Sequence, residues 1–254
     1  MHRIAYLLAF ATLALGSNAT PALAQDAGNT IAQVQAVTPL PGHTGAFLDG
    51  LREQMELYRD TGGAWPWATF QVVMGPRTGQ FVFYTGGHTY ADFDSPDGDQ
   101  QRLEESFYDN IEPHVQHATS WFLRARPDLG ISTPGSPVRP IYEVITLQTA
   151  GPDMDMQMVH VLESIKASWE AMGGGEYSVF QGAQGADPGQ WVVTIPHENF
   201  ASMDGPSGSM EDLFAVAAGE FQARALVNMF AEAISSATSE VFVLRRDLSM
   251  NLGN

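Results

Sequence analysis

Two pairs of histidines are the side chains in this sequence best suited to metal binding or proton transfer. His114 and His117 stand three positions apart in a predicted helix, where that spacing places both imidazoles on one face. Such a pair could bind a metal or a haem iron, or it could be a surface pair beside a helix end. His88 and His197 each follow a predicted strand, where a histidine could act as a general base or simply bond to backbone. These four histidines are the candidate catalytic residues.

Gln71 and Gln181 are candidate ligand-binding residues at the middle of two predicted strands. Strand alternation places Gln71 on the same face as Trp67 and opposite Phe70. A buried amide must find hydrogen bonds, so the two glutamines could face each other across a cavity and contact a ligand. Alternatively, they could satisfy each other or the backbone. We predict a ligand site formed by Gln71, Gln181, Trp67 and Tyr90.

Motifs that identify a specific chemistry are absent from the sequence. It has no G-x-S-x-G, H-E-x-x-H, Walker A or G-x-G-x-x-G pattern. It also has no cysteine, which excludes disulfides and thiolate metal sites, and no metal site is predicted. The formal net charge of −17 disfavours binding to nucleic acid or anionic lipid. The expected partner is therefore a small-molecule ligand.

An internal repeat supplies the elements that would position these residues. Residues 31–96 align with residues 141–206 at a constant offset of 110 without a gap, and 13 of the 66 positions are identical. Unrelated sequences would share roughly one position in fifteen, given ordinary residue usage. The match predicts one structural unit used twice.

Each unit is predicted to have the element order β-α-β-β-α-β. The first helices carry apolar faces at Phe47, Leu51, Met55 and Tyr58, and at Met158, Leu162, Ile165 and Trp169. The predicted strands span 31–37, 67–74, 80–84 and 120–126 in the first unit, and 141–147, 177–183, 190–195 and 240–246 in the second. The predicted second helices span 99–118 and 209–235, and from there on the two units align at an offset of 120.

This order is that of the ferredoxin-like split β-α-β unit. We predict an α+β fold with two tandem ferredoxin-like repeats, over 25–127 and 140–254, packed as a single-chain α/β barrel. A proline-rich linker at 128–139 joins them and is too short for freely tumbling domains.

The first 24 residues are predicted to be a signal peptide. A basic start at His2 and Arg3, an apolar stretch over 4–15 and the small-residue pattern Ala22-Leu23-Ala24 are typical of secretory signals. We therefore expect a periplasmic or secreted protein without membrane insertion, as a monomer or a homodimer.

The duplicated unit resembles the dimeric α/β-barrel superfamily, which includes antibiotic-biosynthesis-type and haem-degrading monooxygenases and the chlorite dismutase group. The resemblance rests on element order and duplication. It implies the barrel and, for the haem-degrading members, a histidine from the second helix paired with an asparagine on the first strand. His114 and His117 match that histidine in place, whereas the first strand offers only Gln33 and Gln35.

Three functions remain open at the level of sequence. The first is an exported protein that binds a small apolar or aromatic ligand in the barrel. The second is a monooxygenase-type enzyme, cofactor-free or haem-dependent, that uses barrel or helix histidines. The third is a structural or interaction module without a site. A cavity separates the first from the third, and a histidine facing that cavity would favour the second.

Overall fold

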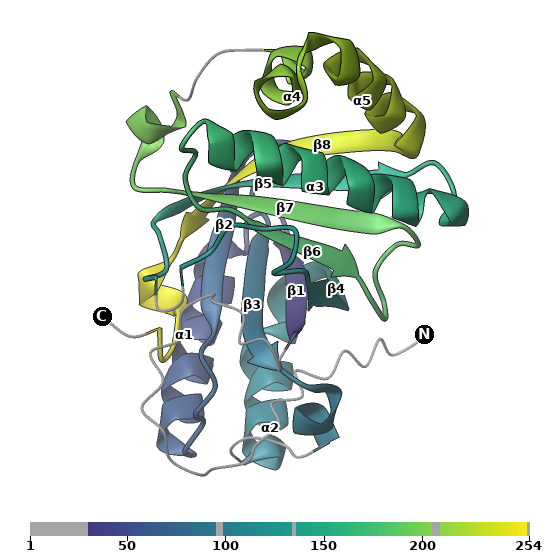
Figure 1. Cartoon of the computed structure of the whole chain (residues 1–254). Helices are drawn as coiled ribbons and strands as arrows, with labels where there is room; N and C mark the ends of the chain where they lie inside the picture. Colours follow the sequence, from purple (N-terminus) through teal and green to yellow (C-terminus); the bar gives the residue numbers. More distant parts are fainter. Residues whose placement is uncertain (1–29, 95–98, 134–135, 205–208, 253–254) are drawn as a thin grey trace.

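The computed structural model describes residues 30–94, 99–133, 136–204 and 209–252 (Figure 1). The predicted signal peptide at 1–24 lies outside the described residues. Within the described ranges, no helix has the length and apolar character needed to cross a membrane.

The fold is α+β, with eight antiparallel strands and five α-helices in the part of the chain that the structure describes. The first half contains β1 Ile31–Pro39, α1 Thr44–Asp60, β2 Ala68–Met74, β3 Phe81–His88, α2 Gln100–Asn110 and β4 Val115–Ala125. The second half contains β5 Ile141–Thr149, α3 Asp155–Ala171, β6 Ser178–Gly182, β7 Gln190–His197, α4 Met210–Ala218, α5 Glu220–Ala233 and β8 Ile234–Leu244.

The eight strands follow one another in a closed order, β1-β3-β2-β8-β5-β7-β6-β4. Within the halves, β1 lies between β3 and β4, and β5 lies between β7 and β8. The halves join where β2 pairs with β8 and β4 pairs with β6. Every strand therefore has a neighbour on both sides, and no sheet edge is left open.

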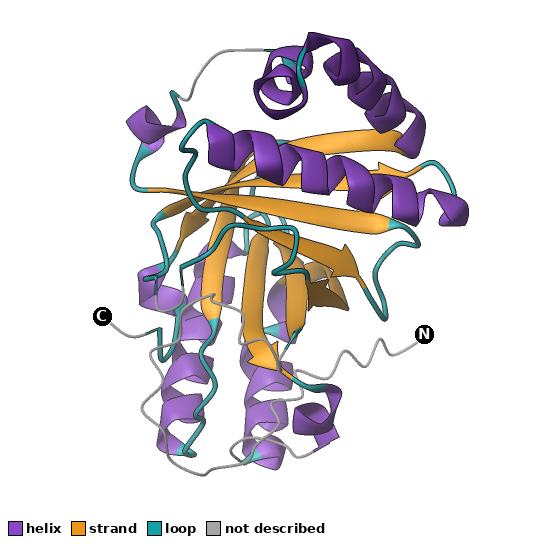
Figure 2. Ribbon diagram, in the orientation of Figure 1, coloured by secondary structure: helices purple, strands orange, loops and turns teal. Residues whose placement is uncertain are grey.

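The helices cover the outside of the strands in two groups (Figure 2). α1 and α2 lie together against the first half, whereas α3, α4 and α5 lie against the second. One apolar cluster fills part of the barrel interior, two lie between strands and helices, and a fourth lies among α3, α4 and α5. Because apolar layers lie on both sides of the sheet, strand residues that point inward and strand residues that point outward can both be buried, as Phe70 in β2 and Trp67 directly before it are.

The predicted apolar face of the first helix is confirmed in α1. Phe47, Leu51, Met55 and Tyr58 are all buried, as their spacing of three and four residues requires. In α3, Met158 and Leu162 are buried, while Ile165 and Trp169 pack against the same cluster at its margin.

Both predicted second helices differ from the observed ones. The helix predicted over 99–118 ends at Asn110, and β4 begins at Val115 because that segment pairs with β1. The helix predicted over 209–235 is broken at Gly219, which has a φ of 80° that favours glycine. It resumes as α5, and β8 begins directly after it at Ile234.

The strand pairing also corrects the predicted offset between the fourth strands. Ile31 pairs with Arg124 and its counterpart Ile141 pairs with Val243, so β4 and β8 correspond at an offset of 119 rather than 120. This single step decides which side chains occupy equivalent places inside the barrel.

Candidate functional site

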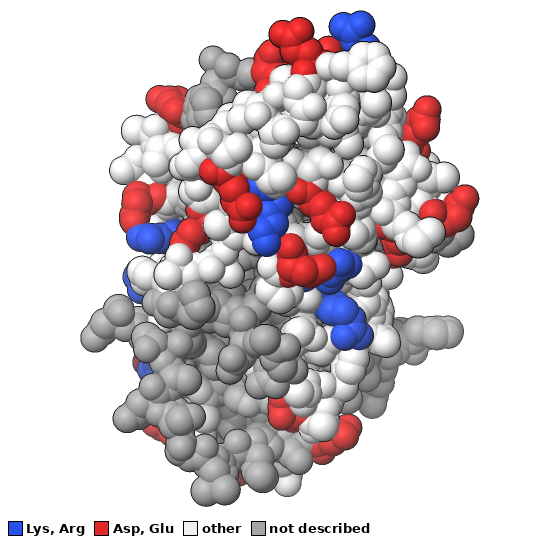
Figure 3. Space-filling model, in the orientation of Figure 1, with Lys and Arg blue, Asp and Glu red and all other residues white. Residues whose placement is uncertain are grey.

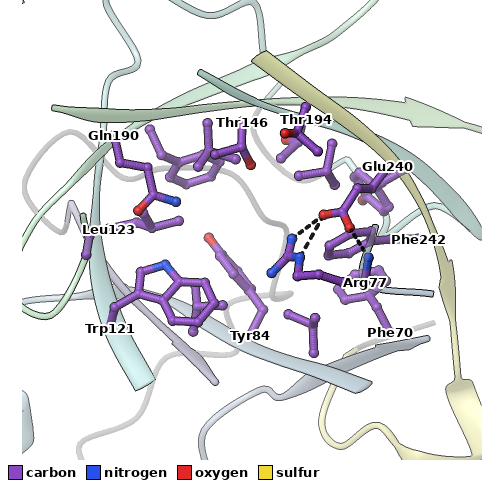
Figure 4. Close-up of a pocket in the computed structure, with 18 of the residues that line it drawn as sticks. Phe70, Arg77, Tyr84, Trp121, Leu123, Thr146, Gln190, Thr194, Glu240 and Phe242 are labelled. Carbon is purple, nitrogen blue, oxygen red and sulfur yellow. Dashed lines mark hydrogen bonds and ion pairs between the residues drawn. The ribbon is translucent and has the colours of Figure 1, made fainter. Parts of the chain in front are cut away.

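A cavity of about 460 Å³ lies inside the barrel and is lined by strands of both halves (Figure 4). Most of its wall is apolar or aromatic. A volume in this range suits a small organic ligand. The polar or partly polar side chains on the wall are Arg77, Tyr84, Thr119, Trp121, Tyr142, Thr146, Ser178, Asp187, Gln190, Thr194, Thr238 and Glu240.

Two equivalent rows of side chains face this cavity. In the first half, Val34 is in register with Tyr84 on one neighbouring strand and with Trp121 on the other. In the second half, Val144 is in register with Thr194 and Glu240 in the same way. The valines match, but a tyrosine and a tryptophan stand where the other half has a threonine and a glutamate. The two ends of the cavity therefore differ in chemistry.

An ion pair closes the Glu240 end. The Glu240 side chain is only 2% exposed, and the Arg77 side chain, on the turn between β2 and β3, is 31% exposed. Arg77 donates from Nε to Oε2 of Glu240 at 2.8 Å, from Nη2 to the same oxygen, and from its backbone N–H to Oε1 at 3.0 Å. Its guanidinium also lies 5.6 Å from the ring centre of Phe242. The buried carboxylate is thus both paired and hydrogen-bonded, as burial demands.

The turn that carries Arg77 approaches Glu240 closely. Gly75 has a φ of 106°, and a side chain there would run into the Glu240 side chain. The equivalent Gly185, with a φ of 81°, lies against Trp121 in the other half. Both turns therefore need glycine, for its conformation and for close packing.

At the other end, Trp121 and Tyr84 line the cavity, and within the described part of the chain the hydrogen-bond donor of each has no partner. The Trp121 indole N–H is buried and unpaired, and among the described residues the Tyr84 hydroxyl has no hydrogen-bond partner either. Figure 4 shows the Tyr84 side chain extending toward the open centre and the indole nitrogen of Trp121 on the side of its ring that faces Gln190. Burial raises the pKa of Tyr84, and the Tyr142 hydroxyl nearby adds to that effect. Tyr84 is therefore a protonated hydroxyl, able to donate, throughout the physiological range.

The position of Tyr84 depends on a glycine in the same strand. Its ring lies over Gly86, where an added Cβ would collide with the hydroxyl. The second half has Pro196 at this place and Thr194 in place of the tyrosine. Directly after Tyr84, Thr85 pairs with Gln33, and a bulge in the pairing of β1 with β3 follows between Gln33 and Ile31.

Tyr142 lines the cavity from β5, but its hydroxyl is already engaged. It accepts a hydrogen bond from the backbone N–H of Arg139 at 3.1 Å. Burial raises the pKa of Tyr142 to about 12, so it too is neutral under physiological conditions.

The structure does not bring Gln71 and Gln181 together, and neither lines the cavity. The amide oxygen of Gln71 accepts from Arg245 at 3.2 Å. The amide nitrogen of Gln181 donates to Asp155 at 3.2 Å, at the start of α3. The alternation expected for β2 is present, but Phe70 rather than Gln71 faces the barrel. The prediction that the glutamines face each other across the barrel is therefore wrong.

Trp67 and Tyr90, also predicted to bind a ligand, lie away from the cavity as well. Trp67 is buried in the cluster beneath α1 and α2. Tyr90 is on the surface, where its hydroxyl donates to Gln184 and its ring meets the edge of Phe122.

None of the four candidate histidines lines the cavity. His88 is buried at the end of β3, where its ring centre lies 4.0 Å from the ring centre of Trp65. Its Nε2 lies 2.7 Å from the Thr85 hydroxyl. Burial lowers the pKa of His88 to about 4, so it is neutral at pH 7. His197 lies at the end of β7, with Nδ1 3.2 Å from the carbonyl of Ser202.

His114 and His117 do not share a helix face, because the helix ends before them. His114 ends a short 3-10 turn, and its Nδ1 lies 3.0 Å from Nδ1 of His43 on the surface. His117 is exposed in β4, opposite Thr38. The expectation of a shared helical metal or haem site at this pair is therefore wrong.

The cavity wall does not fit a haem iron. It offers no histidine, cysteine or methionine. Its two tyrosines are held protonated by burial, whereas iron prefers the phenolate. Elsewhere in the described ranges, no group of three histidine, aspartate or glutamate side chains lies close enough to hold a metal ion.

Sequence reasoning missed Arg77, Tyr84, Trp121 and Glu240, which are among the polar or partly polar side chains on the cavity wall. It concentrated on positions that are identical between the halves. The signal lay instead in positions that differ: Arg77 aligns with Asp187 at the offset of 110, and Trp121 aligns with Glu240 once the offset is 119.

No protein-family model and no curated protein sequence matches the chain. Solved structures do match over most of its length. A candidate monooxygenase from Lactobacillus acidophilus NCFM has a TM-score of 0.53 and 10% identity, covering 89% of this chain and 97% of its own. An anthrone oxidase-like protein has a TM-score of 0.55 and 11% identity, covering 89% and 94%. A candidate chlorite dismutase has a TM-score of 0.49 and 10% identity, covering 86% and 96%. The first two show that this chain shares their α+β fold, which fits a ferredoxin-like arrangement of strands and helices.

Proposed function

We propose that this protein binds a small apolar or aromatic molecule inside its barrel. The observation that carries the proposal is the cavity of about 460 Å³, whose wall is mostly apolar or aromatic, as at Val34, Phe70 and Leu123, with polar side chains between. Ligand sites in proteins have this composition, in which apolar contact provides affinity and a few polar groups fix orientation. A filled barrel, as a purely structural module would have, offers no such space.

The barrel that encloses the cavity has two halves with the same order of elements. The internal repeat and the equal order of elements in the halves favour a tandem duplication of one ferredoxin-like unit, packed as a single-chain barrel. We further propose that the protein is exported, on the strength of its first 24 residues. Its surface suits an aqueous compartment, since Figure 3 shows acidic side chains spread over the visible face, several of them beside arginines.

The test is titration with N-phenyl-1-naphthylamine, a neutral dye whose fluorescence rises in apolar surroundings. We expect saturable binding of one dye per chain. Thr194→Trp places a large ring in the cavity and should reduce dye affinity at least about tenfold. Ser239→Trp, on an exposed position of the adjoining β8, is the matched control and should bind as the parent does. Unsaturable binding, or equal affinity in both variants, would overturn the proposal.

Oxidation of the bound ligand is the second candidate function. The observation favouring it is that apolar and aromatic side chains from strands of both halves line the cavity, so that a bound molecule would be partly removed from water. The similar structures described as a candidate monooxygenase and an anthrone oxidase-like protein suggest which chemistry to test. Incubation of the protein with anthrone under air and under argon, followed by mass spectrometry, tests it. Three results together would support an enzyme: the product forms faster than in buffer, it forms only under air, and Thr194→Trp does not form it. Any other outcome leaves ligand binding as the proposed function.

A further inference from the structure

The unpaired donors of Trp121 and Tyr84 define what kind of ligand the cavity can hold best. A buried N–H or O–H without a partner costs free energy that a ligand acceptor would recover. The Trp121 nitrogen can only donate, and the Tyr84 hydroxyl donates because burial keeps it protonated. Both groups therefore require an oxygen or nitrogen acceptor on the ligand.

The two donors are placed to serve a single acceptor region. Tyr84 on β3 and Trp121 on β4 flank Val34 on β1 in one register row, so their backbones are about 10 Å apart at ordinary strand spacing. Both side chains extend from that row toward the open centre of the cavity (Figure 4). The Val34 side chain between them forms an apolar floor on which a flat molecule can rest.

The charges around the cavity favour a neutral acceptor over an anion. The cationic group on the wall is Arg77, and Glu240 already neutralises it. At the opposite end, the turn that packs Gly185 against Trp121 carries Asp187, whose carboxylate also lines the cavity. A ligand carboxylate beside Trp121 would therefore meet like charge and no free cation.

We propose that the ligand is a neutral, flat, largely aromatic molecule with a carbonyl oxygen that accepts hydrogen bonds from Trp121 and Tyr84. A carbonyl oxygen has two lone pairs and can accept from both donors at once. The apolar body of the ligand then extends toward Phe70 and Phe242, which line the far end of the cavity. This inference rests on the proposed binding function and adds the substrate class.

The experiment compares three probes of similar shape: 9-fluorenone, fluorene, and fluorene-9-carboxylate. Fluorenone differs from fluorene by the carbonyl alone. Binding is measured by displacement of N-phenyl-1-naphthylamine. We expect fluorenone to bind at least about tenfold tighter than fluorene, which corresponds to two modest hydrogen bonds, and the carboxylate to bind weakest.

Three variants assign the effect to the two donors. Tyr84→Phe removes one donor and keeps the ring. Trp121→Phe removes the other donor and replaces the indole with a smaller aromatic ring. Each should lower fluorenone affinity about fivefold and leave fluorene affinity unchanged within about twofold. Tyr142→Phe is the comparison variant: that hydroxyl lines the same cavity and accepts a hydrogen bond from the backbone N–H of Arg139, but its own O–H can still donate. Its fluorenone affinity should stay unchanged, and a loss as large as in Tyr84→Phe would overturn the assignment of the carbonyl to Trp121 and Tyr84.

A spectroscopic readout separates a hydrogen bond from a change of cavity shape. The infrared C=O stretch of bound fluorenone should lie below its value in hydrocarbon solvent and move back upward in Trp121→Phe and Tyr84→Phe. Equal affinity for fluorenone and fluorene with no shift of the stretch overturns the carbonyl inference and leaves the binding function intact. Failure of the dye and of all three probes to bind overturns the binding function itself.

Discussion

Replacing Arg77 by methionine should destabilise the protein strongly. The Glu240 side chain is 2% exposed, and the substitution would leave this buried carboxyl group without its partner. Breaking a buried ion pair from one side costs about 3–5 kcal/mol, and the partial exposure of Arg77 places the expected loss near the lower end, about 3 kcal/mol. For a protein of this size, that corresponds to a fall in Tm of roughly 6–12 °C.

A double-mutant cycle turns this expectation into a measurement of the pair. Glu240→Gln should cost only about 1–2 kcal/mol, because the amide oxygen still accepts from Arg77 and the arginine remains partly hydrated. The double variant Arg77→Met/Glu240→Gln removes both charges and should lose about as little as Glu240→Gln alone. The expected coupling energy is therefore about 2–3 kcal/mol. Arg77→Lys keeps the charge but loses the two-pronged contact and should fall between the parent and Arg77→Met.

Equilibrium unfolding in urea at pH 7 measures each free energy of unfolding, and equal m-values confirm that the variants unfold alike. If the two single losses simply add, within about 0.5 kcal/mol, the side chains do not act as a pair. The account of the Glu240 end of the cavity would then be wrong.

Three further predictions concern neighbouring features. Gly86→Ala should lower the free energy of unfolding by about 1–3 kcal/mol in urea titrations, because the new methyl displaces the Tyr84 ring, whereas Gly45→Ala, in open space on α1, should not destabilise. Burial lowers the pKa of His88 to about 4. Its neutral form should therefore contribute stability that is fully present above about pH 6.5 and is lost as pH falls toward 4. NMR titration of His88 checks the pKa, and His88→Gln should show a flatter dependence of the free energy of unfolding on pH. Burial raises the pKa of Tyr84 and Tyr142, so stability should fall as pH rises above about 10, and their phenolate absorbance should appear together with unfolding rather than before it.

Sequence periodicity predicted the elements of this fold well where one side of an element decides its burial. The face of α1 around Phe47 and Met55 is an example, because only a helix places residues at that spacing on one side. The face of β2 that enters the barrel could not be predicted in this way. Phe70 and Trp67 point to opposite sides and both are buried, since helices cover the outside and the opposite wall covers the inside.

The start of β4 shows a different limit. The segment from Val115 to Ala118 follows a helix and Pro113 without a strand-like alternation, and it becomes a strand because β1 offers it a partner at Thr38 and Pro39. Such a gain from non-local pairing leaves little trace in the local sequence. Because the predicted helix extends to residue 118, it places His114 and His117 on one helix face as candidate metal or haem ligands. The observed helix ends before both residues.

The difference between the two rows of cavity side chains has a consequence for selectivity. A barrel assembled from two identical chains must present every wall residue twice, so a bound molecule meets the same surroundings after half a turn. Here one chain supplies both walls, with Trp121 on one side and Glu240 at the equivalent place on the other. The cavity can therefore bind a ligand in one orientation. It can also discriminate by affinity between molecules that differ in the position of a single polar group.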